Sequence, residues 1–238
     1  IIETQGEEIG KLAKAAGAEF IVYTDPISLG VLEAPANYGA TICVGDLHGL
    51  GLHLNFGGGQ AGFIASHDDM RYITEFKELV DGMVETTVPG EQGYSVVLIE
   101  RTHYAMRENG KEFTGTQNNL WTAPVAVYLS LMGPKGMEEI GHTIMTNAKY
   151  AAKKLAGIPG VSLRFPSVFF KEFVVNFDKT GKTVEEINQQ LLSRQIFGGV
   201  DLSRDYPELG QSALYCVTET ADKESIDRLA GALQAILN

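Results

Sequence analysis

A strand-length apolar run at residues 18–25 (AEFIVYTD) restricts the fold of this chain more than any other sequence feature. The run lacks polar alternation, which is typical of a strand that is buried on both faces of a sheet. Three further short apolar runs are predicted strands, at residues 41–44, 61–65 and 94–100. Because segments with helical periodicity accompany these strands, the sequence predicts an α/β fold whose sheet has parallel character.

Helical periodicity and further strands follow each other in the rest of the chain. The predicted helices lie at residues 3–16, 122–133, 136–156, 183–195 and 223–237. The later predicted strands lie at residues 161–165, 172–177 and 213–219. The order β-β-α-β-α at the end of the chain predicts a small α+β domain at residues 141–238. Within it, Thr183 and Glu186 fit a capping box at the start of a helix.

Composition argues against two functional classes. The net charge of −11 argues against a nucleic-acid binder, because phosphate backbones attract clustered Lys and Arg. No apolar stretch approaches the roughly 18 residues that a membrane span needs. The two cysteines, Cys43 and Cys216, lie in apolar runs and are expected to be buried thiols, and no His/Cys spacing predicts a metal site. So few cysteines are typical of a reducing compartment, and a cytoplasmic location is expected.

The densest glycine usage lies at residues 45–62 (GDLHGLGLHLNFGGGQAG). Glycine permits positive φ angles and close approach of the backbone to a ligand. Tight loops between strands are one interpretation, and a phosphate cradle at Gly57, Gly58 and Gly59 is the other. Neither a P-loop nor a GxGxxG motif is present, so the glycine content by itself leaves both interpretations open.

The order of the motifs is more informative than any single motif. A strand that ends at Asp25, a second strand and a glycine-rich loop resemble the core of fold-type-I pyridoxal-phosphate enzymes. Over nearly its whole length the chain resembles the P-protein family of the glycine cleavage system, glycine dehydrogenase (decarboxylating), and looks like the C-terminal half of subunit 1 of its split form. The stretches that carry the resemblance are DPISLG (25–30), PANYG (35–39), ICVGD (42–46), GLHLNFGGGQAGF (51–63), RTH (101–103) and VYLSLMGPKG (127–136).

The resemblance implies a fold and a cofactor. The fold would be that of a fold-type-I pyridoxal-phosphate-dependent transferase, with residues 1–140 forming the C-terminal part of a large mixed-sheet domain. The reaction would be the decarboxylation of glycine, followed by transfer of the aminomethyl group to the lipoylated H-protein. In such a site Asp25 would face the pyridine nitrogen, His48 would lie near the cofactor, and the glycines at 57–59 would approach its phosphate.

Gly49 occupies the position of the family's Schiff-base lysine, in the stretch Asp46-Leu47-His48-Gly49. Glycine has no amine, so no catalytic residue is predicted in this chain, and the chain by itself is expected to be inactive. This agrees with subunit 1 of the split enzyme, and it implies a lysine-bearing subunit 2 that carries the pyridoxal phosphate. Residues 111–118 also depart from the family's pattern, which leaves open a divergent paralogue with a changed substrate.

Asp25 and His48 also have purely structural interpretations. Asp25 can cap an Asp-Pro-x-Ser turn in which Ser28 binds nearby backbone. A single histidine beside leucines, such as His48, is more often a hydrogen-bonded structural residue than a ligand. Both interpretations remain beside the cofactor-binding ones.

Arg101, His103 and Arg107 form a basic cluster in this acidic chain. Arginine binds carboxylates and phosphates through two parallel hydrogen bonds, so contact with substrate or with another subunit is one interpretation. The alternative is ion pairing with the neighbouring glutamates at positions 100, 108 and 112.

The resemblance implies that the chain is a subunit of an oligomeric glycine decarboxylase. The alternative is a non-catalytic scaffold, a divergent homologue without cofactor that only dimerises with a partner. An independent pyridoxal enzyme, such as an aminotransferase, is disfavoured because Gly49 replaces the lysine.

Overall fold

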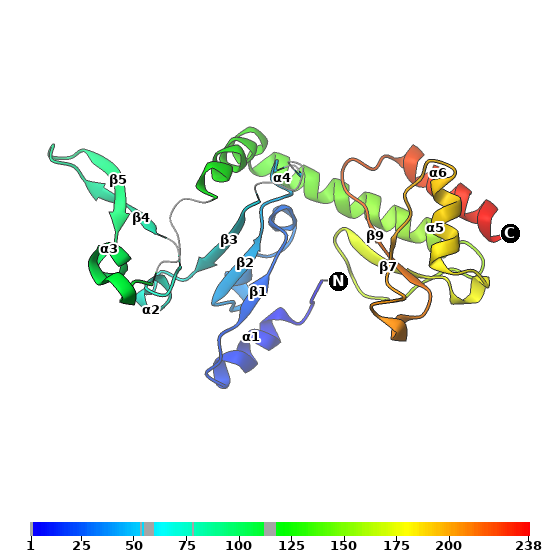
Figure 1. Ribbon diagram of the computed structural model, residues 1–238, viewed down its shortest axis with the longest axis horizontal. Helices are drawn as coiled ribbons and strands as arrows, with labels where there is room; N and C mark the ends of the chain where they lie inside the picture. Colours follow the sequence, from blue (N-terminus) through cyan, green and yellow to red (C-terminus); the bar gives the residue numbers. More distant parts are fainter. Residues whose placement is uncertain (1, 53, 55–59, 78, 112–117) are drawn as a thin grey trace. The chain divides into compact units, whose positions relative to one another are not determined.

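The computed structural model describes residues 2–52, 54, 60–77, 79–111 and 118–238 (Figure 1). The contacts within the chain divide it into two compact units. We call Gly6–Gly133 the N-terminal unit, and Pro134–Asn238 together with Ile1–Gln5 the C-terminal unit.

The N-terminal unit begins with helix α1 (Gly6–Ala15) and a three-stranded sheet (Figure 1). β1 (Ile21–Tyr23) pairs in parallel with β2 (Ile42–Asp46), and β3 (Gly62–Ser66) pairs antiparallel with the other edge of β2. Gly17 follows α1 with a φ of 65°, the left-handed conformation that ends many helices. The sheet is therefore mixed, because the predicted parallel character holds for β1 and β2 while β3 runs the other way.

The prediction that the first strand is buried on both faces is wrong. The side chains of Ile21 and Tyr23 are 57% and 68% exposed. Helix α1 packs against the 3-10 helix Pro35–Tyr38 and leaves these two side chains uncovered. An apolar run shows that a strand has hydrophobic surface to bury, but it does not show which chain covers that surface.

Two further strands form a separate antiparallel hairpin, β4 (Val80–Glu85) and β5 (Gln92–Val97). β5 corresponds to the strand predicted at residues 94–100. The sequence does not predict β4, because glycine and acidic residues interrupt its apolar positions. Short helices lie on either side of the hairpin in the sequence: α2 (Met70–Ile73) and α3 (His103–Met106).

The long helix α4 (Asn119–Ala156) contains a break at Gly133, whose φ of 60° and ψ of −179° are not helical. Its two parts correspond to the helices predicted at residues 122–133 and 136–156. Glycine adopts this backbone conformation without the steric cost of a side chain. The two compact units divide at this break, and a domain boundary at residue 140 stays a prediction.

The C-terminal unit contains a four-stranded antiparallel sheet in the order β6-β7-β9-β8. Its strands are β6 (Ser162–Leu163), β7 (Glu172–Asn176), β8 (Val200–Asp201) and β9 (Ser212–Cys216). Its remaining helices are α5 (Val184–Leu192) and α6 (Lys223–Leu237). The sequence predicts all of these elements except β8, which lies outside the predicted strands.

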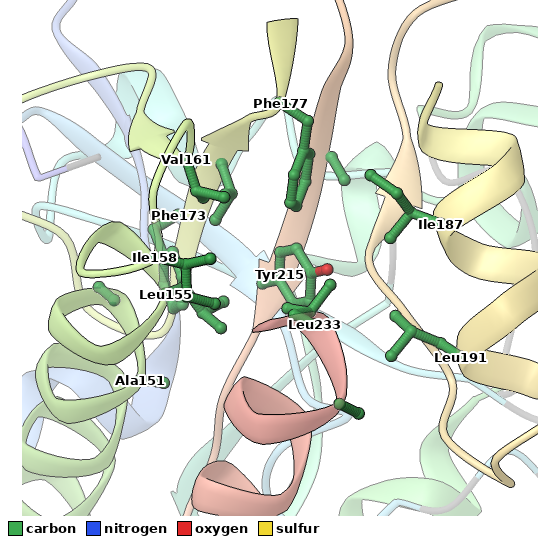
Figure 2. Packing of buried hydrophobic residues seen from close by; sticks show 14 of the residues in the cluster. Ala151, Leu155, Ile158, Val161, Phe173, Phe177, Ile187, Leu191, Tyr215 and Leu233 are labelled. Atoms are coloured by element: carbon green, nitrogen blue, oxygen red, sulfur yellow. The ribbon is translucent and has the colours of Figure 1, made fainter. Parts of the chain in front are cut away.

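The hydrophobic core of the C-terminal unit is formed by its helices and by the inner face of its sheet (Figure 2). Leu155 of α4, Leu191 of α5 and Leu233 of α6 are each 0% exposed. Tyr215 of β9 lies among them, and burial raises the pKa of its phenol to about 12. The helices that pack this core are therefore ones that the sequence predicts.

The two cysteines differ in their surroundings. Cys43 in β2 is half-buried, and burial raises the pKa of its thiol. Cys216 ends β9 and is exposed, so the prediction of a buried thiol is wrong there. Successive residues of a strand point to opposite faces, and Cys216 follows Tyr215, which points into the core.

Candidate functional site

Asp25 begins a turn directly after β1. Its Oδ1 accepts a hydrogen bond from the backbone N–H of Ile27 at 3.0 Å, which caps the 3-10 helix Pro26–Gly30. The Ser28 hydroxyl donates to the Asp25 carbonyl at 2.7 Å, and the Ser28 N–H donates to the same oxygen at 3.0 Å. The predicted Asp-Pro-x-Ser turn is therefore confirmed, and one carboxylate oxygen of Asp25 is engaged in it.

Gly49 lies in the turn that follows β2, beside Asp25. A Cβ atom built on Gly49 would lie 4.0 Å from Asp25 Oδ1 and 2.9 Å from Ile27 Cδ1. The fold thus brings Asp25 and position 49 together, as the resemblance implies. Ile27 is only 5% exposed, so its side chain is held in the space that a larger residue at 49 would enter.

These three residues do not fit a pyridoxal phosphate that is bound covalently at this turn. The amine is absent, and the methyl end of Ile27 lies 2.9 Å from where the Cβ of a larger residue would be. The carboxylate of Asp25 already accepts a backbone hydrogen bond within its own turn. The cofactor-binding role of Asp25 stays a prediction.

A second carboxylate lies at the same edge of the sheet. Asp46 ends β2, and the carboxyl ends of parallel strands such as β1 and β2 meet at one edge, where α/β proteins commonly bind ligands. Asp46 Oδ2 accepts from the Tyr23 hydroxyl at 2.7 Å, and its Oδ1 accepts from the His48 N–H at 3.0 Å. His48 is half-buried, and its backbone is fixed by this turn.

Sequence reasoning missed Tyr23 and Asp46 as site residues. The available signal was that two adjacent parallel strands each reach an aspartate at the carboxyl end, Asp25 and Asp46. The predicted phosphate contacts at 57–59 lie outside the described residues.

The three residues of the basic cluster, Arg101, His103 and Arg107, differ in burial and in their contacts. Arg101 is 7% exposed, and its Nη1 donates to the carbonyl of Phe76 at 2.6 Å. His103 begins α3 with its ring 4.4 Å from the ring of Tyr104, and both His103 and Arg107 are exposed. Arg101 thus has a structural role, whereas the other two side chains can reach a ligand or another chain.

A groove of about 700 Å³ lies at the opposite end of β1 and β2, bordered by α1. Its wall includes Glu19, whose carboxylate accepts from the Tyr72 hydroxyl at 2.7 Å and lies 3.5 Å from Arg71. The hydrogen bond from Tyr72 is the main cause that lowers the pKa of Glu19. This groove does not include Asp25, His48 or Gly49, so the candidate site is defined by its residues and not by this groove.

Metal sites and membrane-spanning helices are two further features to consider in the part of the chain that the structure describes. No group of three or more His, Cys, Asp or Glu side chains there could hold a metal ion. None of the helices found there combines the length and the apolar character that crossing a membrane requires.

Solved structures of known proteins share the fold of this chain. A solved structure of glycine decarboxylase (P-protein) of the glycine cleavage system, in inhibitor-bound form, superposes with a TM-score of 0.86 at 31% identity, over 97% of this chain and 51% of that one. A NifS-like protein from Rickettsia africae superposes with a TM-score of 0.64 at 16% identity, over 98% of this chain and 57% of that one. The predicted fold class, a fold-type-I pyridoxal-phosphate-dependent transferase-like α/β fold, is confirmed.

The sequence comparisons agree with the structural ones. A protein from Pyrococcus furiosus named probable glycine dehydrogenase (decarboxylating) subunit 1 is 36% identical over 237 residues, which is 100% of this chain and 52% of that protein. The chain therefore spans about half the length of the curated relatives that it matches. The sequence profile of the glycine cleavage system P-protein matches residues 2–233. With nearly every residue inside that match and the same fold in a solved P-protein, this chain belongs to the glycine cleavage system P-protein family.

Proposed function

We propose that this chain acts as subunit 1 of a two-chain glycine dehydrogenase (decarboxylating), an oxidoreductase of the glycine cleavage system. One observation supports the assignment of the Schiff-base lysine to the partner chain. Gly49 lies beside Asp25 where the family's lysine is expected, and Ile27 fills the adjacent space. This chain would contribute scaffold, substrate channel and subunit interface, while the partner contributes the lysine. By itself it is expected to be inactive.

The partner that we propose is a lysine-bearing subunit 2 that carries the pyridoxal phosphate. When bound there, the cofactor would draw electrons from the substrate carbon as glycine loses CO2. The lipoylated H-protein would be the second protein partner and would receive the aminomethyl group. The exposed apolar side chains of β1, Ile21 and Tyr23, support an oligomeric enzyme, because contiguous apolar surface commonly marks an interface.

The candidate residues of this chain would then act next to the partner's cofactor. His48 and the glycines at 57–59 are the proposed contacts near that cofactor, and Asp25 holds the turn that follows β1. His103 and Arg107, both exposed, are the proposed contacts to substrate or to the other chain. The cytoplasm is the proposed compartment, because a low cysteine content suits a reducing environment.

Mixing the two chains tests this proposal. Pyridoxal phosphate is added to this chain, to the lysine-bearing subunit and to their mixture, followed by borohydride reduction and peptide mapping. We expect a reducible visible band and a covalent label on the partner's lysine, and glycine decarboxylation by the mixture only.

Three other outcomes have distinct meanings. A label on this chain would contradict the proposal, because another lysine would then hold the cofactor. A labelled partner that decarboxylates glycine equally well without this chain would favour the non-catalytic scaffold. A labelled but inactive mixture would point to a different substrate.

A further inference from the structure

The hairpin β4–β5 presents one face whose side chains all point outward. Met83 and Tyr94 lie directly opposite each other, flanked by the pairs Asp81–Val96 and Glu85–Gln92. Side chains at alternate positions of a strand share a face, so these six residues form one surface. We call them the outer face of the hairpin.

The outer face is hydrophobic at its centre and uncovered. Met83 is 61% exposed, Tyr94 is 83% exposed and Val96 is 36% exposed. β4 and β5 pack chiefly against each other, since neither is packed to a comparable extent on any other described element. An isolated two-stranded hairpin is only marginally stable in water, so this ribbon gains stability when a further surface covers it.

The charge of the hairpin restricts what can cover it. Residues 80–97 contain Asp81, Glu85 and Glu91, and no Lys, Arg or His. Asp81 and Glu85 lie on the outer face on either side of Met83, and neither forms an ion pair within the part of the chain that the structure describes. A second copy of the same face would add two further carboxylates and no basic side chain to the contact, so nothing in it would balance their charge. A surface with an apolar centre and basic side chains on both sides complements it.

We propose that the outer face of the β4–β5 hairpin is a docking surface for the lysine-bearing partner subunit, which meets it with an apolar patch flanked by Lys or Arg. This inference rests on the proposed function, because it takes its occupant from the two-chain enzyme. The apolar pair Met83–Tyr94 supplies the buried centre of the contact, and aromatic side chains at the centre of an interface commonly dominate its affinity. The carboxylates on either side set orientation and salt dependence.

The affinity of the full chain for the purified, cofactor-loaded partner tests the inference, measured by sedimentation and by surface binding at low and high salt. Tyr94→Asp is expected to raise Kd by about tenfold or more. Tyr94→Phe keeps the apolar area and is expected to bind like the unchanged chain. The double variant Asp81→Asn/Glu85→Gln is expected to bind more weakly at low salt and to show a flatter salt dependence.

Phe197→Asp is the matched control. Phe197 is 88% exposed and belongs to the C-terminal unit, so the same change of chemistry there should leave Kd unaltered. Thermal unfolding of each variant reports whether it is folded.

Two outcomes separate this inference from the proposed function. If the unchanged chain and Tyr94→Asp bind the partner equally well, the hairpin assignment is wrong and the two-chain enzyme stands. If the unchanged chain does not bind the partner at all, the proposed function fails and the hairpin assignment fails with it. Self-association that Tyr94→Asp abolishes, with partner binding intact, would replace the partner with a second copy of this chain.

Discussion

At the scale of single residues, position 49 shows how one side chain determines what a turn can hold. The backbone still places this position beside Asp25. Ile27 fills the adjacent space with a buried apolar side chain, and Asp25 uses a carboxylate oxygen to cap its own turn. A lysine restored here would therefore have to displace the methyl end of Ile27.

Replacement of Gly49 tests this view. Gly49→Ala and Gly49→Lys are each expected to lower the free energy of unfolding by about 1 kcal/mol, because the crowding against Ile27 Cδ1 begins at Cβ in both. Neither variant should give a borohydride-reducible band with pyridoxal phosphate. Denaturant unfolding and absorption spectra measure the two effects. A reducible band in Gly49→Lys alone would show that Ile27 moves aside readily.

At the scale of elements, the start of α5 shows a local sequence signal that the structure retains. The Thr183 Oγ1 accepts from the Glu186 N–H at 3.2 Å, and the Glu186 carboxylate accepts from the Thr183 N–H at 2.9 Å. The predicted capping box is confirmed. It depends on residues only one helical turn apart, so tertiary packing is not needed to specify it.

Substitutions in the capping box should change stability in a pH-dependent way. Thr183→Ala is expected to lower the free energy of unfolding by about 1 kcal/mol, and Thr183→Ser to lower it much less.

The backbone hydrogen bond from Thr183 is the main cause that lowers the pKa of Glu186. The stabilisation that the ionised Glu186 carboxylate gives is therefore present above its unfolded-state pKa, and it is lost as the pH falls through its folded-state pKa. Glu186→Gln should be less stable than the unchanged chain at neutral pH and equally stable in acid. Urea unfolding measures the free energy of unfolding of both chains. If Glu186→Gln were less stable than the unchanged chain by the same amount at both pH values, the prediction would be wrong.

At the scale of the whole molecule, the two units differ in how much core they contain. The continuous cluster of buried apolar side chains belongs to the C-terminal unit, from Ala148 to Ile236. In the N-terminal unit the sheet leaves Ile21, Tyr23 and Ile64 largely exposed. The C-terminal unit thus has the packing of an independent domain, whereas the N-terminal unit has hydrophobic surface that other chains can cover.

Leu191→Ala tests whether that core belongs to one unit. Leu191 is 0% exposed, so its truncation is expected to cost the C-terminal unit about 2–5 kcal/mol. Hydrogen exchange measured by mass spectrometry should show faster exchange in β7, β9 and α5, and unchanged exchange in β1–β3. Leu192→Ala is the matched control, because the neighbouring leucine is 57% exposed. Equal acceleration in both units would mean that they unfold together.

Features that depend on short stretches of chain can be predicted from the amino-acid sequence. The sequence predicts the helices that carry Leu155, Leu191 and Leu233, and the spacing of Thr183 and Glu186 predicts a cap. The order of motifs around Asp25 and Gly49 indicates the family and the missing amine. These signals lie in local patterns and in residue identity, so they can be recognised without the three-dimensional structure.

Contacts between distant residues, and the surfaces that stay exposed, depend on the folded chain as a whole. The apolar run of β1 predicts burial, yet Ile21 and Tyr23 are exposed, because cover depends on what packs over the sheet and not on the strand itself. The pairing of Met83 with Tyr94 depends on the register of β4 and β5, since a shift by one residue would turn each side chain to the other face. The crowding of Ile27 against Gly49 likewise joins two turns that are separate in the sequence. Such contacts arise from the folded backbone as a whole, and so no local pattern predicts them.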